Sequence, residues 1–259
     1  MREVLLQIFS NDIGGPEIDV FNFFHILYFF LTMATTFCFA FFFRNKDEAF
    51  KKRVLDIYAF VIVGLYLGDF FVHPFMTGEN ALIVDKLPFH LCTISAVLIA
   101  ITRLFPKQTK VIKNAVTILG IVGALMYITY PNGAVGGGTK AFCYKILQTF
   151  LYHGCLVTYG VLAMAYGECK LEYKKIYIEL IMICSLTLIS LGANASYSST
   201  EHHYDWFFTT GSSFGMSPYV MPFIMIVIIF AMCNAIYGLY FLFKYLINRK
   251  KAPALEEAK

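Results

Sequence analysis

The sequence predicts an all-α integral membrane protein that forms a single transmembrane domain of seven helices over residues 1–259. Apolar residues make up 58% of the chain and charged residues only 15%, a balance outside the range of soluble globular domains. Apolar runs long enough to cross a hydrocarbon core about 30 Å thick also follow one another along the chain. These runs cover residues 20–43, 55–72, 87–104, 111–130, 142–166, 175–193 and 217–247.

The basic residues alternate between connections and predict the orientation. Of the 21 lysines and arginines, all but Arg2, Lys86, Lys140 and Lys145 fall in alternate connections or at the C-terminal end. Cytoplasmic connections carry the excess of basic residues in membrane proteins. We therefore expect a multi-pass protein of the cell membrane with its N-terminus outside and its C-terminus in the cytoplasm.

The first two spans carry titratable groups near their outer ends. In the first, His25 is placed where an aromatic ring can lie at the membrane interface. The second runs from Asp56 to Asp69 and His73, and we expect Pro74 to end it. A separation of four residues places Asp69 and His73 on one helix face. The pair is either part of a site or a satisfied ion pair at a helix end.

The third span begins at Leu87-Pro88 and places His90 and Cys92 just inside an apolar segment. A titratable side chain within a bilayer costs roughly 2.5–3.5 kcal/mol, so it usually faces a protein interior or a wet cavity and marks a functional site. Cys92 is two residues beyond His90 and points to another helix face. The fourth span ends near Asn132, before a glycine-rich turn.

The fifth span contains Gln148 and His153, and His153 lies close to the middle of the membrane. The sixth begins near Glu179, which we expect at the cytoplasmic interface, and ends at Asn194. Adjacent histidines in the following loop, 195–216, can bind a divalent metal or belong to a solvated or lid loop. Their spacing matches no standard ligand pattern, and the seven cysteines form no C-x-x-C pair, so we expect no metal and no cofactor.

This topology places all six histidines, with Asp69, Asn132 and Asn194, in the outer half of the membrane or outside it. These groups are predicted to line a cavity that opens toward the outer leaflet. Within it we expect His90 and His153 at successive levels, about 10 Å apart in depth.

At Leu87-Pro88-Phe89-His90-Leu91-Cys92 and Tyr152-His153-Gly154, and in its seven-span layout, the chain resembles the YwaF-like family of bacterial integral membrane proteins, which is related to animal transmembrane protein 164. The resemblance implies an acyltransferase that moves a fatty acyl chain between phospholipids. It also implies a ring of helices around a central cavity, similar to the fatty-acid elongases. His90 and His153 match the family's histidines, but Phe89 stands where the animal motif has a catalytic cysteine.

The sequence thus favours a phospholipid acyltransferase or transacylase with His90, His153, Cys92 and Asp69 as catalytic residues. An imidazole would act as nucleophile or general base, or Cys92 would act as nucleophile after a helix rotation. His73, Asn132, Gln148 and Asn194 are the expected substrate-binding residues. Membrane phospholipids or acyl lipids are the expected partners, with no nucleic acid and no protein partner. A small-solute or ion transporter and a non-enzymatic lipid- or solute-binding protein are the alternatives.

Overall fold

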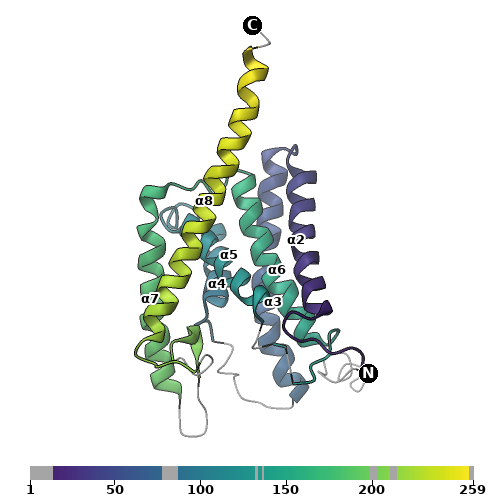
Figure 1. The fold of residues 1–259 in the computed structure, drawn as a ribbon, viewed down its shortest axis with the longest axis vertical. Helices are drawn as coiled ribbons and strands as arrows, with labels where there is room; N and C mark the ends of the chain where they lie inside the picture. Colours follow the sequence, from purple (N-terminus) through teal and green to yellow (C-terminus); the bar gives the residue numbers. More distant parts are fainter. Residues whose placement is uncertain are drawn as a thin grey trace.

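The computed structural model describes residues 14–77, 87–131, 134–135, 137–198, 204–210 and 215–256. This part of the chain contains seven α-helices and no β-strand beyond one isolated bridge (Figure 1). Each predicted apolar run corresponds to one helix. The helices are α2 (Phe23–Phe43), α3 (Glu48–Thr77), α4 (Leu91–Leu104), α5 (Lys113–Thr129), α6 (Tyr144–Ala165), α7 (Tyr177–Tyr197) and α8 (Met221–Glu256).

Four described helical segments are long and apolar enough to cross a membrane: α2, α6, α7 with the short 3-10 turn before it, and Met221–Leu246 of α8. The apolar helices α4 and α5 are shorter, with 14 and 17 residues. These lengths and compositions identify a multi-pass membrane protein.

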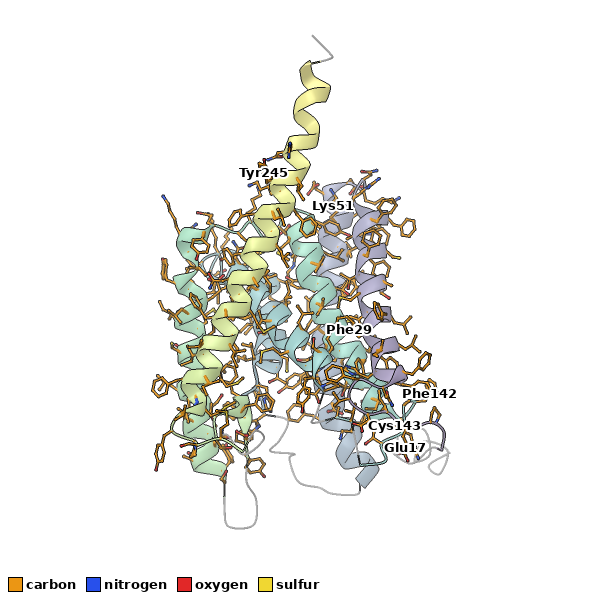
Figure 2. The ribbon with its side chains drawn as sticks, viewed as in Figure 1. Glu17, Phe29, Lys51, Phe142, Cys143 and Tyr245 are labelled. Atoms are coloured by element: carbon orange, nitrogen blue, oxygen red, sulfur yellow. The ribbon has the colours of Figure 1, made fainter. Side chains whose placement is uncertain are left out.

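Helices that follow one another run in opposite directions, so the bundle has two distinct ends (Figure 1). The basic end, where α2 ends and α3 begins near Lys51, lies at the top of the view. The histidine end, the side on which α2, α4 and α6 begin and α3 and α5 end, lies toward the bottom of the view; Figure 2 labels Lys51 and Glu17 at the two ends. The start of α2 lies at the histidine end, and α8 projects beyond the basic end.

Helix α3 differs from its prediction at both ends. It begins at Glu48, seven residues before the predicted start, because the Asp47 carboxylate accepts a hydrogen bond from the Phe50 N–H and caps the helix. It also continues through Pro74 to Thr77, so the expectation that Pro74 ends it was wrong. A proline removes a single backbone hydrogen bond, and so close to a helix end that loss is tolerated.

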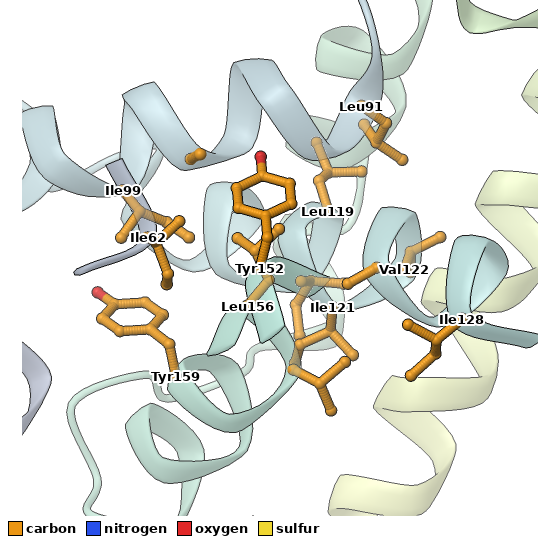
Figure 3. Packing of buried hydrophobic residues seen from close by; sticks show 14 of the residues in the cluster. Ile62, Leu91, Ile99, Leu119, Ile121, Val122, Ile128, Tyr152, Leu156 and Tyr159 are labelled. Carbon is orange, nitrogen blue, oxygen red and sulfur yellow. The ribbon is translucent and has the colours of Figure 1, made fainter. Parts of the chain in front are cut away.

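Helix α5 lies in the middle of the bundle. Every residue from Ala115 to Ala124 is buried, and α5 contacts α4, α6, α7 and α8. Figure 3 shows Leu119 and Ile121 of α5 packed among side chains of the neighbouring helices. Close approach to α6 depends on Gly160, because a Cβ atom there would lie 2.2 Å from Ile121 Cγ1.

Helix α2, in contrast, lies at the edge. Only two of its side chains, His25 and Thr36, are buried. The Thr36 hydroxyl shares a 2.8 Å hydrogen bond with Thr158 of α6, and Thr32 lies against Gly154. The remaining apolar face of α2 is exposed, which suits a helix that borders lipid.

An ion network closes the basic end. Arg103 Nε donates to Asp56 Oδ1 at 2.6 Å, and Arg103 Nη1 lies 3.5 Å from Glu168 Oε2, which also pairs with Lys113. Burial opposes ionisation of Glu168, but the hydrogen bond from Lys113 and the nearby positive charges outweigh it and lower the pKa of this carboxyl. The network thereby joins α3, α4, α5 and the connection after α6.

Candidate functional site

Three helices bring polar groups together at the histidine end: α4 at its first turn, α5 at its last turn and α6 near its middle. The Tyr152 hydroxyl of α6 donates to the Cys92 carbonyl oxygen of α4 at 2.9 Å. On the other side, the Tyr127 ring of α5 stacks on His153, with centroids 4.3 Å apart and planes 5° apart. This hydrogen bond places the first turn of α4 beside the first half of α6.

His153 is buried on α6 with its two ring nitrogens in different situations. Nδ1 lies 2.8 Å from the carbonyl oxygen of Thr149, one turn earlier in the helix. A carbonyl oxygen accepts hydrogen bonds, so Nδ1 carries the proton and Nε2 carries a lone pair in the neutral ring. Within the described part of the chain, buried Nε2 has no hydrogen-bond partner. The ring therefore presents one basic nitrogen for chemistry.

His90 stands at the N-cap of α4, just before the first helical residue. The helix therefore begins one residue after His90, although His90 lies within the predicted apolar run 87–104. Its Nδ1 accepts a hydrogen bond from the backbone N–H of Phe207 at 3.2 Å. Neutral His90 therefore carries its proton on Nε2, the reverse of His153. The two imidazoles are also close enough to interact electrostatically.

Three further predicted residues lie around this site. Asp69 of α3 is half-buried and interacts electrostatically with Tyr127 and Tyr144. Gln148, half-buried on α6, donates to the Leu65 carbonyl oxygen at 3.3 Å. Cys92 is half-buried in the first turn of α4. Asp69, Cys92, Gln148 and the two histidines therefore come from three helices, α3, α4 and α6, to one region.

The other predicted site residues are placed differently. Asn194 lies on α7, where its amide donates to the Trp206 carbonyl oxygen and the Thr209 hydroxyl and accepts from the Trp206 N–H. Both amide hydrogens of Asn194 are thus used within the protein. His73 belongs to α3, but its side chain is outside the described part. Asn132 and the histidines of the loop after α7 also lie outside the described residues.

Two titratable residues expected at the membrane interface are buried within the protein. His25 is 3% exposed, accepts from the Phe21 N–H and donates to the Ile128 carbonyl oxygen, so both ring nitrogens are satisfied. Glu179 is 1% exposed because α8 covers it and the Tyr237 hydroxyl donates to its Oε1 at 2.7 Å. Both side chains are therefore enclosed by neighbouring helices, and their depth in the membrane stays a prediction.

The sequence interpretation missed the aromatic residues that surround the site. Tyr127 and Tyr152 enclose the His153 ring, and Trp206 packs edge-on against Phe89 with centroids 5.1 Å apart. In a chain with 17% aromatic residues, such side chains give no distinctive signal. The position of Thr149 did give a signal. Its carbonyl group is four residues before His153 and therefore within reach of the His153 ring on a helix.

A pocket of about 310 Å³ lies between α4, α5 and α7. Its polar lining side chains are Ser95 and Ser185, and the rest of the lining is apolar. The pocket is bounded at one side by Pro88, Phe89 and Leu91, the neighbours of His90, although neither His90 nor His153 lines it. This volume is at the lower end of the range for small-ligand sites, about 300–1,000 Å³.

Within the described residues, no group of three or more histidine, cysteine or acidic side chains is placed to hold a metal ion. In comparisons with known proteins, a family model described as the TMEM164 family matches residues 20–243. No curated protein and no solved structure matches the chain.

Proposed function

Since the chain belongs to the TMEM164 family, we propose that it is a membrane-embedded phospholipid acyltransferase or transacylase that acts through His153. The observation that carries this proposal is the buried Nε2 of His153, to which none of the described residues bonds. A buried polar atom without a partner is costly and needs an explanation, and binding to a substrate supplies one. His153 is also fixed in the tautomer that a nucleophile or general base requires.

In the nucleophilic route, His153 Nε2 attacks the carbonyl carbon of a phospholipid ester. The bond to the lysolipid oxygen breaks, that oxygen takes up a proton, and an acyl-imidazole forms. The hydroxyl of a second lipid then attacks the acyl carbon, loses its proton and releases the imidazole. In the general-base route, Nε2 takes the proton of the acceptor hydroxyl as this attacks the ester directly, and it returns that proton to the lysolipid oxygen as the donor ester bond breaks. Cys92 is the alternative nucleophile.

The pocket between α4, α5 and α7 is suited to hold part of an acyl chain. Its walls are mostly apolar, and it reaches the residues on both sides of His90. An ester group at that side of the pocket would lie close to the polar groups of the histidine end. A ring of helices around a central tunnel, as in the elongases, remains part of this proposal.

The remaining residues have supporting roles in the proposal. The carboxylate of Asp69 would compensate a positive charge that develops on an imidazole. Gln148, His73 and Asn132 would contact the substrate, and Asn132 would donate to the oxyanion. Asn194 has no spare amide hydrogen, so we assign it no contact with substrate. By the positive-inside rule the basic end faces the cytoplasm, and the site opens toward the outer leaflet.

The test uses purified full-length protein in nanodiscs of mixed phospholipids with different acyl chains. Redistribution of acyl chains, followed by lipid mass spectrometry, is the expected result, and His153→Gln protein and empty nanodiscs are the controls. Unchanged lipids across several donor and acceptor pairs would contradict the proposal. Solute flux through proteoliposomes without acyl exchange would favour a transporter, and retained lipid without exchange a binding protein.

A further inference from the structure

A short aromatic segment between α7 and α8, Trp206–Phe208, contacts the His90 ring. Trp206 and Phe207 of this segment are buried, each 2% exposed, and the Phe207 N–H donates to His90 Nδ1. Phe207 and Phe208 have φ angles of 59° and 54°, in the left-handed region that bulky residues rarely adopt. Such strain persists only where surrounding contacts determine the conformation.

Asn194 supplies those contacts. Its amide donates to the Trp206 carbonyl oxygen at 3.0 Å and to Thr209 Oγ1 at 2.7 Å, and it accepts from the Trp206 N–H at 3.0 Å. Both the residue before Phe207 and a residue after it are therefore bonded to a single buried side chain on α7. This arrangement fixes the direction of the Phe207 N–H.

The same face of α7 also holds the other side of His90. Ser190 lies four residues before Asn194, and its hydroxyl donates to the Phe89 carbonyl oxygen at 2.8 Å. The backbone before His90 and the donor to its ring are thus both positioned by α7. Trp206 completes the contact through its ring packing on Phe89.

We infer that Asn194 is a positioning residue that holds the His90 ring, through Phe207, in the tautomer opposite to that of His153. The Phe207 N–H requires a lone pair on His90 Nδ1 and leaves the proton on Nε2. The Thr149 carbonyl requires a proton on His153 Nδ1 and leaves a lone pair on Nε2. The site therefore contains one imidazole set as a donor and one set as an acceptor.

This division has a catalytic consequence that rests on the proposed function. His153 would attack or take the proton, whereas His90 would donate a hydrogen bond or a proton to the oxygen that becomes negatively charged. Two histidines in the same tautomer would duplicate one of these roles. The tautomers themselves can be measured whether or not the protein transfers acyl chains.

The experiment is NMR of full-length protein in nanodiscs with ¹⁵N-labelled histidine, at about pH 8, above the ordinary imidazole pKa of about 6.5. Signals of the two rings are assigned with His90→Gln and His153→Gln proteins. In the unmodified chain we expect the proton on Nε2 of His90 and on Nδ1 of His153. A wild-type His90 ring with its proton on Nδ1 would overturn the inference.

The test variant is Asn194→Ala, which removes all three hydrogen bonds to the segment. We expect the His90 signal to become a mixture of both tautomers, while the His153 signal stays unchanged. Ser196→Ala is the matched control, because its exposed hydroxyl bonds only to the Gly192 carbonyl of its own helix among the described contacts. The control should leave both rings unchanged.

A second variant keeps the test decisive if Asn194→Ala fails to fold. Thr209→Val preserves the volume of a fully buried side chain and removes one acceptor of the Asn194 amide, so a smaller shift in the same direction is expected. A folded variant of either kind with His90 still entirely protonated on Nε2 would refute the positioning role.

Where acyl transfer is measurable, kcat of Asn194→Ala should fall about tenfold with KM near the wild-type value. Correct tautomers without acyl transfer would reject the proposed function alone.

Discussion

His153 donates from Nδ1 to the carbonyl oxygen of Thr149, 2.8 Å away, and this single bond decides which ring nitrogen is basic. The partner is a backbone atom of the preceding helical turn, so it persists as long as α6 does. The orientation of the ring is further held by the stacked Tyr127 and the edge-on Tyr152. The basic nitrogen is therefore placed by local structure and by neighbouring helices together.

Replacing His153 with glutamine should abolish most of the proposed acyl transfer. The variant removes the basic nitrogen but keeps a polar side chain of comparable size, so we expect the rate to fall about 10²–10⁴-fold while the protein still folds. Lipid mass spectrometry measures the rate of acyl transfer, and scanning fluorimetry measures Tm to check that the variant folds. Cys155→Ala, two residues further along α6, is the matched control and should keep its activity. Near wild-type activity in His153→Gln would remove His153 from the mechanism.

Gly160→Ala should destabilise the bundle. The added Cβ would lie 2.2 Å from Ile121 Cγ1, so the Ile121 side chain or the two helices have to shift, and overpacking of this kind costs about 1–3 kcal/mol. Thermal unfolding in detergent or nanodiscs measures the loss. Gly64→Ala in α3 is the control, because no neighbouring atom of the described residues lies within 4 Å of a Cβ at that position. Equal Tm values for the two variants would show that the close approach of Gly160 to Ile121 does not contribute to the stability of the bundle.

The ion network at the basic end should make stability depend on pH in the acid range. The pKa of Glu168 in the folded protein is below its ordinary value of 4.5, so the folded state favours the ionised carboxylate. The stabilisation is therefore complete above pH 4.5 and is lost as the pH falls through the lower, folded-state pKa. Tm measured at a series of pH values tests this expectation.

Two variants sharpen the pH test. Glu168→Gln should lower Tm at neutral pH and flatten its decline in acid, because the titrating group is gone. Glu172→Gln should behave like the wild type, because its ion pair with Lys175 is exposed and such pairs contribute about 0–1 kcal/mol. An unchanged acid profile in Glu168→Gln would assign the decline to other groups.

Tyr237→Phe should destabilise the contact between α7 and α8 by about 1–3 kcal/mol, because it leaves the buried Glu179 carboxyl without its donor. Glu179→Gln is the matched variant. It keeps an oxygen for the Tyr237 hydroxyl and avoids a buried charge, so its stability should be close to or above that of the wild type. Chemical or thermal unfolding of the two variants, and of the double variant, measures the coupling. A more stable Tyr237→Phe protein would contradict the assignment.

The helices were largely predictable because a long run of apolar residues is by itself typical of a membrane-spanning helix. The runs 20–43 and 142–166 correspond closely to α2 and α6, since about 20 apolar residues in sequence are enough to specify such a helix. Helix ends were less predictable: α3 starts seven residues before the predicted run 55–72, through a polar cap that hydropathy does not detect. Pro74 in the last turns of α3 led to a wrong prediction of the helix end, because a helix tolerates the loss of one backbone hydrogen bond near its end.

The sequence by itself determined the membrane class, the seven helices, their alternating directions and the presence of His90 and His153 within apolar segments. Hydropathy and basic-residue counts are properties of short sequence segments. They can be read without knowing which segments are neighbours in space. Only the tertiary structure decided that Asn194 binds Trp206, that α8 buries Glu179 and that the two histidines hold opposite tautomers. These outcomes depend on single hydrogen bonds between groups far apart in the chain, whose distance and direction are set only when the helices pack.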